Sequence, residues 1–227
     1  MQEPETKAYR VVKTNLNAQV YDILKEMIAD RRFTPGSYIN VEKLAQELEV
    51  SRTPIWEAIR RLEQEGIVIH TPHKGVQVRE LTREMALELY EVRETMEGLA
   101  ARLGADRATA HIIAQMEEIL AKQKGVVERG NAIAYSRSDH DFHLLIYQAC
   151  GNELLKELLE GLRYKARPLA FKLAPHFSEF LDFHRQILEA FQRKDGQAAE
   201  AAMRRHNRRM LEIIRNTPWG IEEGNQI

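Results

Sequence analysis

The sequence has a single cysteine and no long uncharged run, and these two absences exclude two classes of protein. Among 227 residues only Cys150 is a cysteine, so the chain cannot form a disulfide within itself. The longest stretch without Asp, Glu, Lys or Arg runs from Phe142 to Asn152, which is 11 residues, whereas a membrane-spanning helix needs about 20 predominantly apolar residues. The first 16 residues have no apolar segment after their charges, unlike a secretory signal. We expect a cytoplasmic protein with no membrane partner.

The chain also lacks an excess of either charge. Residues 1–78 carry 11 Lys and Arg against 11 Asp and Glu, and the whole chain has a net charge of −1. Nucleic-acid binding therefore has to depend on a local basic face rather than on total charge. With 44% hydrophobic and 30% charged residues, the composition is that of a globular protein with a packed core.

The character of the sequence changes near residue 80. Before it, Pro and Gly separate short elements, which we predict to be helices at about 16–32, 41–48 and 52–65. The β-branched residues of 67–69 and 76–78 flank the turn at Pro72–Gly75, and this pattern predicts a β-hairpin. We assign residues 1–78 to an N-terminal domain.

Helical periodicity dominates after residue 80. It predicts six helices at about 82–104, 106–129, 131–150, 152–167, 177–194 and 196–216. The fold class is therefore mainly α, with an all-α antiparallel helical bundle over residues 79–219 and a tail at 220–227.

Three helices followed by a β-hairpin are the plan of a winged helix-turn-helix, in which the third helix enters the major groove of DNA. Arg52 stands at the start of the predicted third helix. An Arg side chain there can form a bidentate contact with phosphate or guanine. Taken alone, a basic residue at a helix start is more often a solvated surface charge.

Several runs in this region resemble the GntR superfamily of bacterial transcription regulators. They are FTPGS (33–37), VEKLAQELEVSRTPIWEAIRRLEQEGIV (41–68) and PHKGVQV (72–78). The resemblance implies a homodimer that reads a short palindromic operator in double-stranded DNA. It also implies DNA contacts from Arg31 or Lys43, from Arg52 and Thr53, and from the wing tip, His73, Lys74 and Gly75.

One position departs from the family pattern. Trp56 stands where the family usually has Arg, one turn after Arg52. An indole donates one hydrogen bond and offers an apolar face, so it could contact a thymine methyl group or a phosphate but could not grip guanine. Because Ile55 and Ile59 occupy the inner face of the helix, we expect Trp56 on the DNA-facing surface; packing inward is the alternative.

Histidines of the second domain form a possible metal site. Asp139 and His143 are four residues apart on one predicted helix, which places them on the same face. His184 and His206 lie on later helices and could face the same cavity. Imidazole and carboxylate ligands suit Zn, Ni, Mn or Fe. A single His on an amphipathic helix is more often a core or surface group.

The segments at 139–162 and 183–206 resemble the FCD ligand-binding domain of the FadR-like branch of this superfamily. The resemblance implies that Asp139, His143, His184 and His206 bind a divalent metal ion. His140, His111 and His176 are left out of the site. Six helices rather than seven would place the chain nearer the VanR-like subgroup.

Many such domains bind a small organic acid that completes the coordination of the metal. Arg93 matches the family's E-x-R pattern and is the first candidate for a further anion contact, with Asn207 as a weaker one. The alternative for Arg93 is a surface ion pair with Glu97, four residues later.

These observations predict a transcriptional regulator whose operator binding is modulated by a small carboxylate at a metal site. A metal-dependent enzyme is the first rival, because three His and one Asp could activate water, but no H-E-x-x-H run is present. We therefore expect no enzyme. The second rival is a DNA-binding protein whose helical domain only dimerises.

Overall fold

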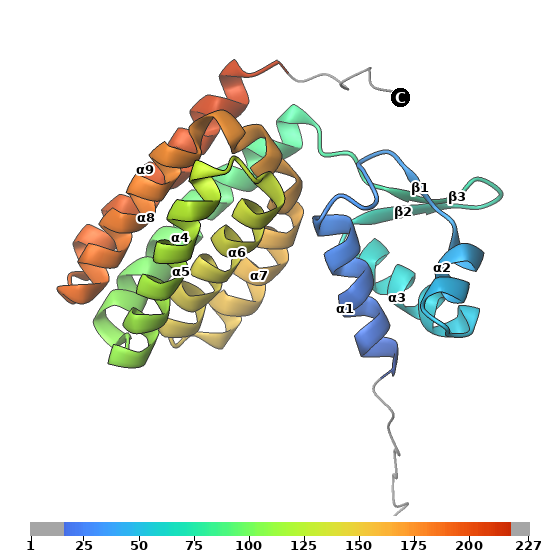
Figure 1. Ribbon diagram of the computed structural model, residues 1–227, viewed down its shortest axis with the longest axis horizontal. Coiled ribbons are helices and arrows are strands. Elements are labelled where there is room, and N and C mark those ends of the chain that lie inside the picture. Colours follow the sequence, from blue (N-terminus) through green and yellow to red (C-terminus); the bar gives the residue numbers. More distant parts are fainter. Residues whose placement is uncertain (1–15, 219–227) are drawn as a thin grey trace, which may run out of the picture. The chain divides into compact units, whose positions relative to one another are not determined.

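The described part of the chain is mainly helical, as the sequence predicts. The computed structural model describes residues 16–218, apart from the side chains of residues 168 and 170–173 (Figure 1). The chain splits into two compact units, with the main division between Arg79 and Glu80. The predicted tail, residues 220–227, lies outside the described residues. Among the residues that are described, none of the helices combines the length and apolarity that a membrane span requires.

The first unit contains three helices close to the predicted ones, α1 (Leu16–Ala29), α2 (Val41–Glu47) and α3 (Arg52–Gln64). Each helix buries an apolar stripe, and the three stripes meet the sheet in one core. Asn40 caps α2, since its side-chain oxygen accepts a hydrogen bond from the Lys43 amide at 2.9 Å. A helix-turn-helix pair, α2 and α3, is thus held against α1.

A three-stranded antiparallel sheet completes the first unit. Its strands are β1 (Tyr38–Ile39), β2 (Val68–Thr71) and β3 (Gly75–Val78), in the order β1-β3-β2. The predicted hairpin is β2 and β3, and its tight turn places Gly75 at a φ of 98°. β1 was not predicted, because a strand of two residues is too short to show an alternating pattern.

The second unit is a helical bundle with helices near all six predicted positions. Its elements are α4 (Arg83–Arg107), α5 (Ala110–Glu128), α6 (Ala132–Ala149), α7 (Glu153–Ala166), the 3-10 segment η1 (Arg167–His176), α8 (Phe177–Gln192) and α9 (Gly196–Asn216). Side-chain caps begin five of the α-helices, from Thr82, Thr109, Asn131, Asn152 and Asp195. The residues between α7 and α8 include Pro168 and Pro175 and form η1.

Helix α4 is the centre of the bundle and contacts α6, α7, α8 and α9. Helix α9 can approach α4 closely because residue 196 of α9 is a glycine. A Cβ atom at Gly196 would lie 2.9 Å from the backbone oxygen of Arg102 on α4. The core of the second unit is therefore built around α4.

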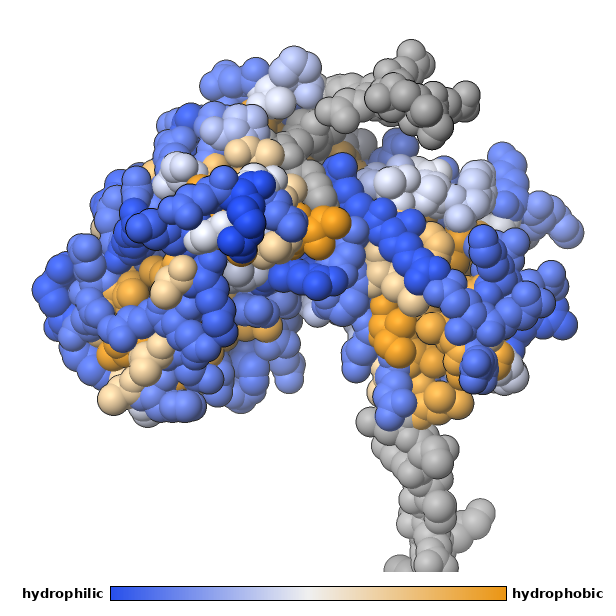
Figure 2. Space-filling view, in the orientation of Figure 1, coloured by the Kyte–Doolittle hydropathy of each residue, from blue (hydrophilic) through white to orange (hydrophobic). Residues whose placement is uncertain are grey.

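In the view of Figure 2 most of the surface is hydrophilic, with an apolar area over α1, where Leu16 and Ile23 are each 42% exposed.

Replacing Gly196 with alanine should destabilise the protein, although alanine is the better helix former. The added Cβ meets backbone, which cannot move aside without shifting α9 against α4, so we expect a loss of about 1–3 kcal/mol. Gly125→Ala is the matched control, because its Cβ would meet only the mobile guanidinium of Arg129 at 3.3 Å. That control should gain about 0.5–1 kcal/mol. Urea unfolding measures both, and equal stabilities would contradict the close approach.

Candidate metal centre and nucleic-acid interface

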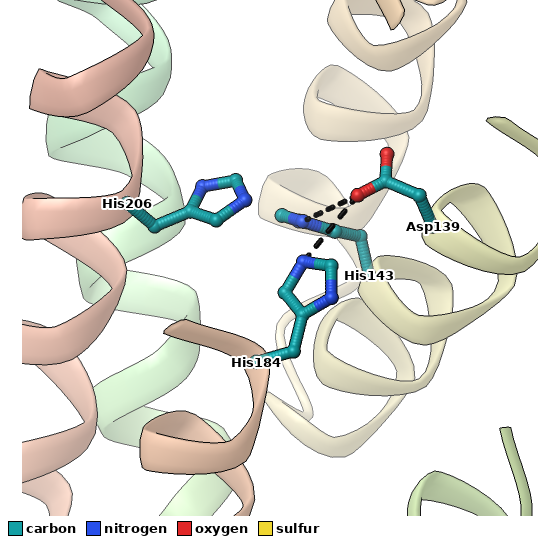
Figure 3. Close-up of side chains that lie close together, drawn as sticks. All are labelled: Asp139, His143, His184 and His206. Atoms are coloured by element: carbon teal, nitrogen blue, oxygen red, sulfur yellow. Dashed lines mark ion pairs between the residues drawn. The ribbon is translucent and has the colours of Figure 1, made fainter. Parts of the chain in front are cut away.

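Four polar side chains from three helices meet inside the second unit (Figure 3). Asp139 and His143 come from α6, His184 from α8 and His206 from α9. Their possible ligand atoms all lie within 4.8 Å of one another, and all four residues are buried. The structure thus brings together the four residues that the resemblance to the FCD domain implied.

The two oxygens of Asp139 have different partners. Oδ1 lies 3.3 Å from His184 Nε2 and 3.9 Å from His143 Nε2, and these are the dashed contacts in Figure 3. Oδ2 accepts a hydrogen bond from the buried guanidinium of Arg163 on α7. The carboxylate therefore presents one oxygen to the histidines while Arg163 holds the other.

The electrostatics keep this carboxylate charged and the imidazoles of His143 and His206 neutral. Burial alone would raise the pKa of Asp139, but the charge of Arg163 holds that pKa well below its usual value. Burial, together with the charge of Arg163, lowers the pKa of His143 to about 4. Burial also holds the pKa of His206 well below its usual value. A proton on the neighbouring His143 would repel a proton on His206, which lowers that pKa further. A neutral imidazole has a free lone pair, which a metal ion requires.

The histidine nitrogens are unusual for a protein core. Both ring nitrogens of His143 and His206, and Nε2 of His184, have no hydrogen-bond partner among the described residues. A buried polar atom without a partner costs roughly 1–3 kcal/mol. A divalent cation would take up these lone pairs, and a set of three imidazoles and one carboxylate fits Zn, Ni, Mn or Fe(II). The residues present therefore suit a metal ion.

A second buried network lies beside the cluster. Arg93 donates from Nε (3.1 Å) and Nη2 (2.9 Å) to Glu97 Oε1, and Asn207 donates to Oε2 at 2.7 Å. Tyr147 donates its hydroxyl to Glu97 as well, and Glu97 Oε1 lies 3.6 Å from His143 Nδ1. The pairing of Arg93 with Glu97 is confirmed, but its location at the surface was wrong: both side chains are fully buried, because they lie on the inward face of α4.

The three histidines left out of the site lie outside the cluster. His140 is buried on α6 and packs edge-to-face on Tyr164, with ring centroids 5.0 Å apart. His111 is exposed, and His176 pairs with Glu179 at 3.6 Å.

Sequence reasoning missed Arg163 and Gln123, which contact the cluster from α7 and α5. Gln123 is fully buried, and its Oε1 lies 2.9 Å from His184 Nδ1. A signal was present for both, since each is a polar residue on an apolar stripe. Arg163 follows Leu155 and Leu159 at intervals of four residues, and Gln123 follows Met116 and Leu120 at intervals of four and then three residues.

The predicted DNA contacts of α2 and α3 lie largely at the surface. Arg52, Thr53 and Lys43 are exposed. Arg52 begins α3, and its Nη1 donates to Glu42 Oε1 at 2.9 Å. This pair is more than half exposed on both sides, so solvent weakens it and Arg52 can exchange partners. Arg31 is half-buried and has a φ of 59°.

The wing tip and Trp56 differ in exposure. His73, Lys74 and Gly75 are all exposed at the turn between β2 and β3. Trp56 is half-buried and packs edge-to-face on His70 of β2, with ring centroids 5.0 Å apart. Part of the indole that we expected on the surface is therefore covered by the hairpin.

A winged helix-turn-helix followed in the same chain by a helical unit with a buried ligand set defines a class, that of DNA-binding regulators with a separate effector domain. The family models agree with this class. Residues 16–78 match that of the bacterial regulatory proteins of the gntR family, and residues 88–209 match that of the FCD domain. The chain belongs to the gntR family, in its FadR-like branch with an FCD domain.

Relatives extend along most of the chain. It is 33% identical over 208 residues to the Nta operon transcriptional regulator of Aminobacter aminovorans, covering 88% of this chain and 96% of that one. It is 27% identical over 216 residues to the HTH-type transcriptional repressor RspR of Escherichia coli, covering 92% and 95%. The structure of E. coli McbR/YncC has the same fold, with a TM-score of 0.82 at 23% identity over 89% of this chain and 98% of that one. The protein is accordingly a DNA-binding transcriptional regulator and not an enzyme.

The buried histidines predict that the metal-free protein loses stability in mild acid. Burial lowers the pKa of His140 to about 3 and that of His143 to about 4, against 6.5 ordinarily. Below pH 6.5 these two histidines bind protons in the unfolded chain but not in the folded chain. The free energy of unfolding therefore falls as the pH falls. We expect a loss of about 1–2 kcal/mol per histidine between pH 6.5 and pH 5.

Thermal unfolding of chelator-treated protein at pH 7.5 and pH 5.0 measures this loss. His143→Gln should make the midpoint less dependent on pH, whereas His111→Gln, at an exposed position outside the cluster, should leave the dependence as in the wild type. Equal midpoints at the two pH values would show that these imidazoles are not kept neutral by the fold.

Proposed function

We propose that this regulator is a cytoplasmic homodimer that binds a palindromic operator in double-stranded DNA, and that a small organic acid bound at a metal ion modulates this binding. The metal ligands are Asp139, His143, His184 and His206. The observation that carries the proposal is the set of five imidazole nitrogens, buried in one cluster, that lack hydrogen-bond partners among the described residues.

The metal ion links the cluster to an anion. Four protein ligands leave positions open on an ion that prefers five or six, as Ni, Mn and Fe(II) do, and Zn can expand to five. The charge of the ion favours a carboxylate in such a position. Arg93 Nη1 lacks a hydrogen-bond partner among residues 16–218, so it can still donate to the carboxylate of the organic acid. Asn207 Oδ1 also lacks a partner there, and it can accept a hydrogen bond from a hydroxyl group of the acid.

An exposed apolar strip supports the homodimer. Leu154 and Leu158 lie one turn apart on α7 and are 68% and 50% exposed. We propose that a second copy of the chain covers this helix face, because covering it would remove both apolar side chains from water. The six α-helices between residues 83 and 216 support the VanR-like subgroup.

The operator contacts that we propose come from the recognition helix, its neighbours and the wing. They are Arg31 or Lys43, Arg52, Thr53, Trp56, His73, Lys74 and Gly75. Of these, Arg52 is the strongest candidate, because it is exposed at the first position of α3.

Arg52→Ala should weaken operator binding by about 1–3 kcal/mol, the loss expected when a bidentate Arg contact is removed. Titration of labelled operator at fixed salt measures this effect. Arg185→Ala is the matched control, since Arg185 also forms an exposed pair, with Asp182 at 2.6 Å, but lies in the second unit. If both variants bind as the wild type does, Arg52 does not contact the operator.

We expect close to one divalent ion per chain in protein purified without a histidine tag. His184→Ala should lose the ion because it removes a ligand, whereas His140→Ala should retain it because His140 faces Tyr164. Elemental analysis, with circular dichroism to confirm folding, measures both. Parallel behaviour of the two variants would contradict the ligand assignment.

The same preparations test the organic acid. A carboxylate that binds at the ion should raise the melting temperature of metal-loaded protein and not of chelated protein, and should change operator affinity. Wild-type protein that takes up no Zn, Ni or Mn would leave dimerisation as the role of the helical unit.

A further inference from the structure

Gln123 contacts the cluster from a helix that supplies none of its four members. It lies on α5, is fully buried, and its Oε1 is 2.9 Å from Nδ1 of His184. The other ring nitrogen of His184, Nε2, lies 3.3 Å from Asp139 Oδ1, inside the cluster. Gln123 and Asp139 therefore contact opposite edges of one imidazole ring.

These two contacts favour opposite tautomers of His184. A neutral imidazole carries one N–H proton, and an oxygen on either side can only accept it. If the proton is on Nε2, it points at Asp139 and blocks the lone pair that a metal ion would need. If it is on Nδ1, it is donated to Gln123, and the lone pair of Nε2 faces the cluster.

We propose that Gln123 is a positioning residue that holds His184 with its proton on Nδ1 and so keeps Nε2 available to a metal ion. Its Oε1 faces Nδ1, as this role requires. The neighbouring positions on the stripe, Met116, Leu120 and Val126, are apolar, and an apolar residue at 123 would extend that stripe. Burying the amide of Gln123 is costly, yet this amide lies where Nδ1 of His184 needs a hydrogen-bond acceptor.

This inference rests on the proposed metal site. Substitutions at Gln123 test the role of this residue separately from the existence of the metal site. Gln123→Leu removes the acceptor at similar volume, and we expect metal affinity to fall about 10–100-fold, the usual effect of losing such a supporting contact. Gln123→Glu keeps an acceptor at the same place and should restore affinity to within a few-fold of the wild type. Gln192→Leu is the control, because Gln192 joins the same two helices through a surface contact with Glu117 at 2.6 Å. Competition with a chromogenic chelator, using Zn and then Ni, measures the affinities.

A spectroscopic readout tests the role without any metal. Long-range ¹H–¹⁵N correlation spectra of metal-free protein distinguish the two tautomers of each histidine. We expect His184 to carry its proton on Nδ1 in the wild type and in Gln123→Glu, and on Nε2 in Gln123→Leu. A wild-type His184 with its proton on Nε2, or a Gln123→Leu protein with unchanged tautomer and affinity, would overturn the proposal. Failure of the wild type to bind Zn or Ni would instead count against the metal site, and the spectra would still decide the role of Gln123.

Discussion

The ion pair between Asp139 and Arg163 is the interaction on which the polar centre of the bundle depends. An ionised carboxylate in a protein interior costs several kcal/mol unless an opposite charge compensates it. Arg163 reaches Asp139 from α7, is itself buried, and binds only the oxygen that faces away from the histidines. One contact thus keeps the carboxylate charged, ties α6 to α7, and leaves Oδ1 directed at His184.

Glu97 on α4 is a second buried carboxylate that a buried Arg compensates. Arg93 neutralises Glu97, and Asn207 and Tyr147 also donate hydrogen bonds to it. These partners come from α4 itself, α9 and α6, so the network fixes the helices that carry His143 and His206. The imidazoles of His143 and His206 then lie near two carboxylates that are each paired with an Arg, and nothing in their described surroundings stabilises an added proton enough to offset burial.

The local pattern of apolar and turn residues predicted most of the fold, because helical stripes and turns depend on residues that are close in sequence. It also predicted that Asp139 and His143 share a face, whereas placing His184 and His206 with them required resemblance to a known domain. The roles of Arg163 and Gln123 could not be derived, since their partners lie 24 and 61 residues away and no local rule links such positions. Arg93 was expected on the surface as an alternative because the spacing to Glu97 suits an exposed pair equally well. Only the packing of α4 at the centre of the bundle decides that both are buried.

The charges of this centre support the proposal that a metal ion and an organic acid bind together. The carboxylates of Asp139 and Glu97 are matched by the guanidinium groups of Arg163 and Arg93, and the imidazoles of His143 and His206 are neutral at pH 7. A divalent ion adds two positive charges to this balanced, buried site, where low dielectric makes an unmatched charge costly. An anion on the ion reduces that excess, so each should bind more tightly in the presence of the other, and by the same factor. An acid that binds in this way alters DNA binding only if it favours one arrangement of the protein over another, since equal affinity for both arrangements shifts neither.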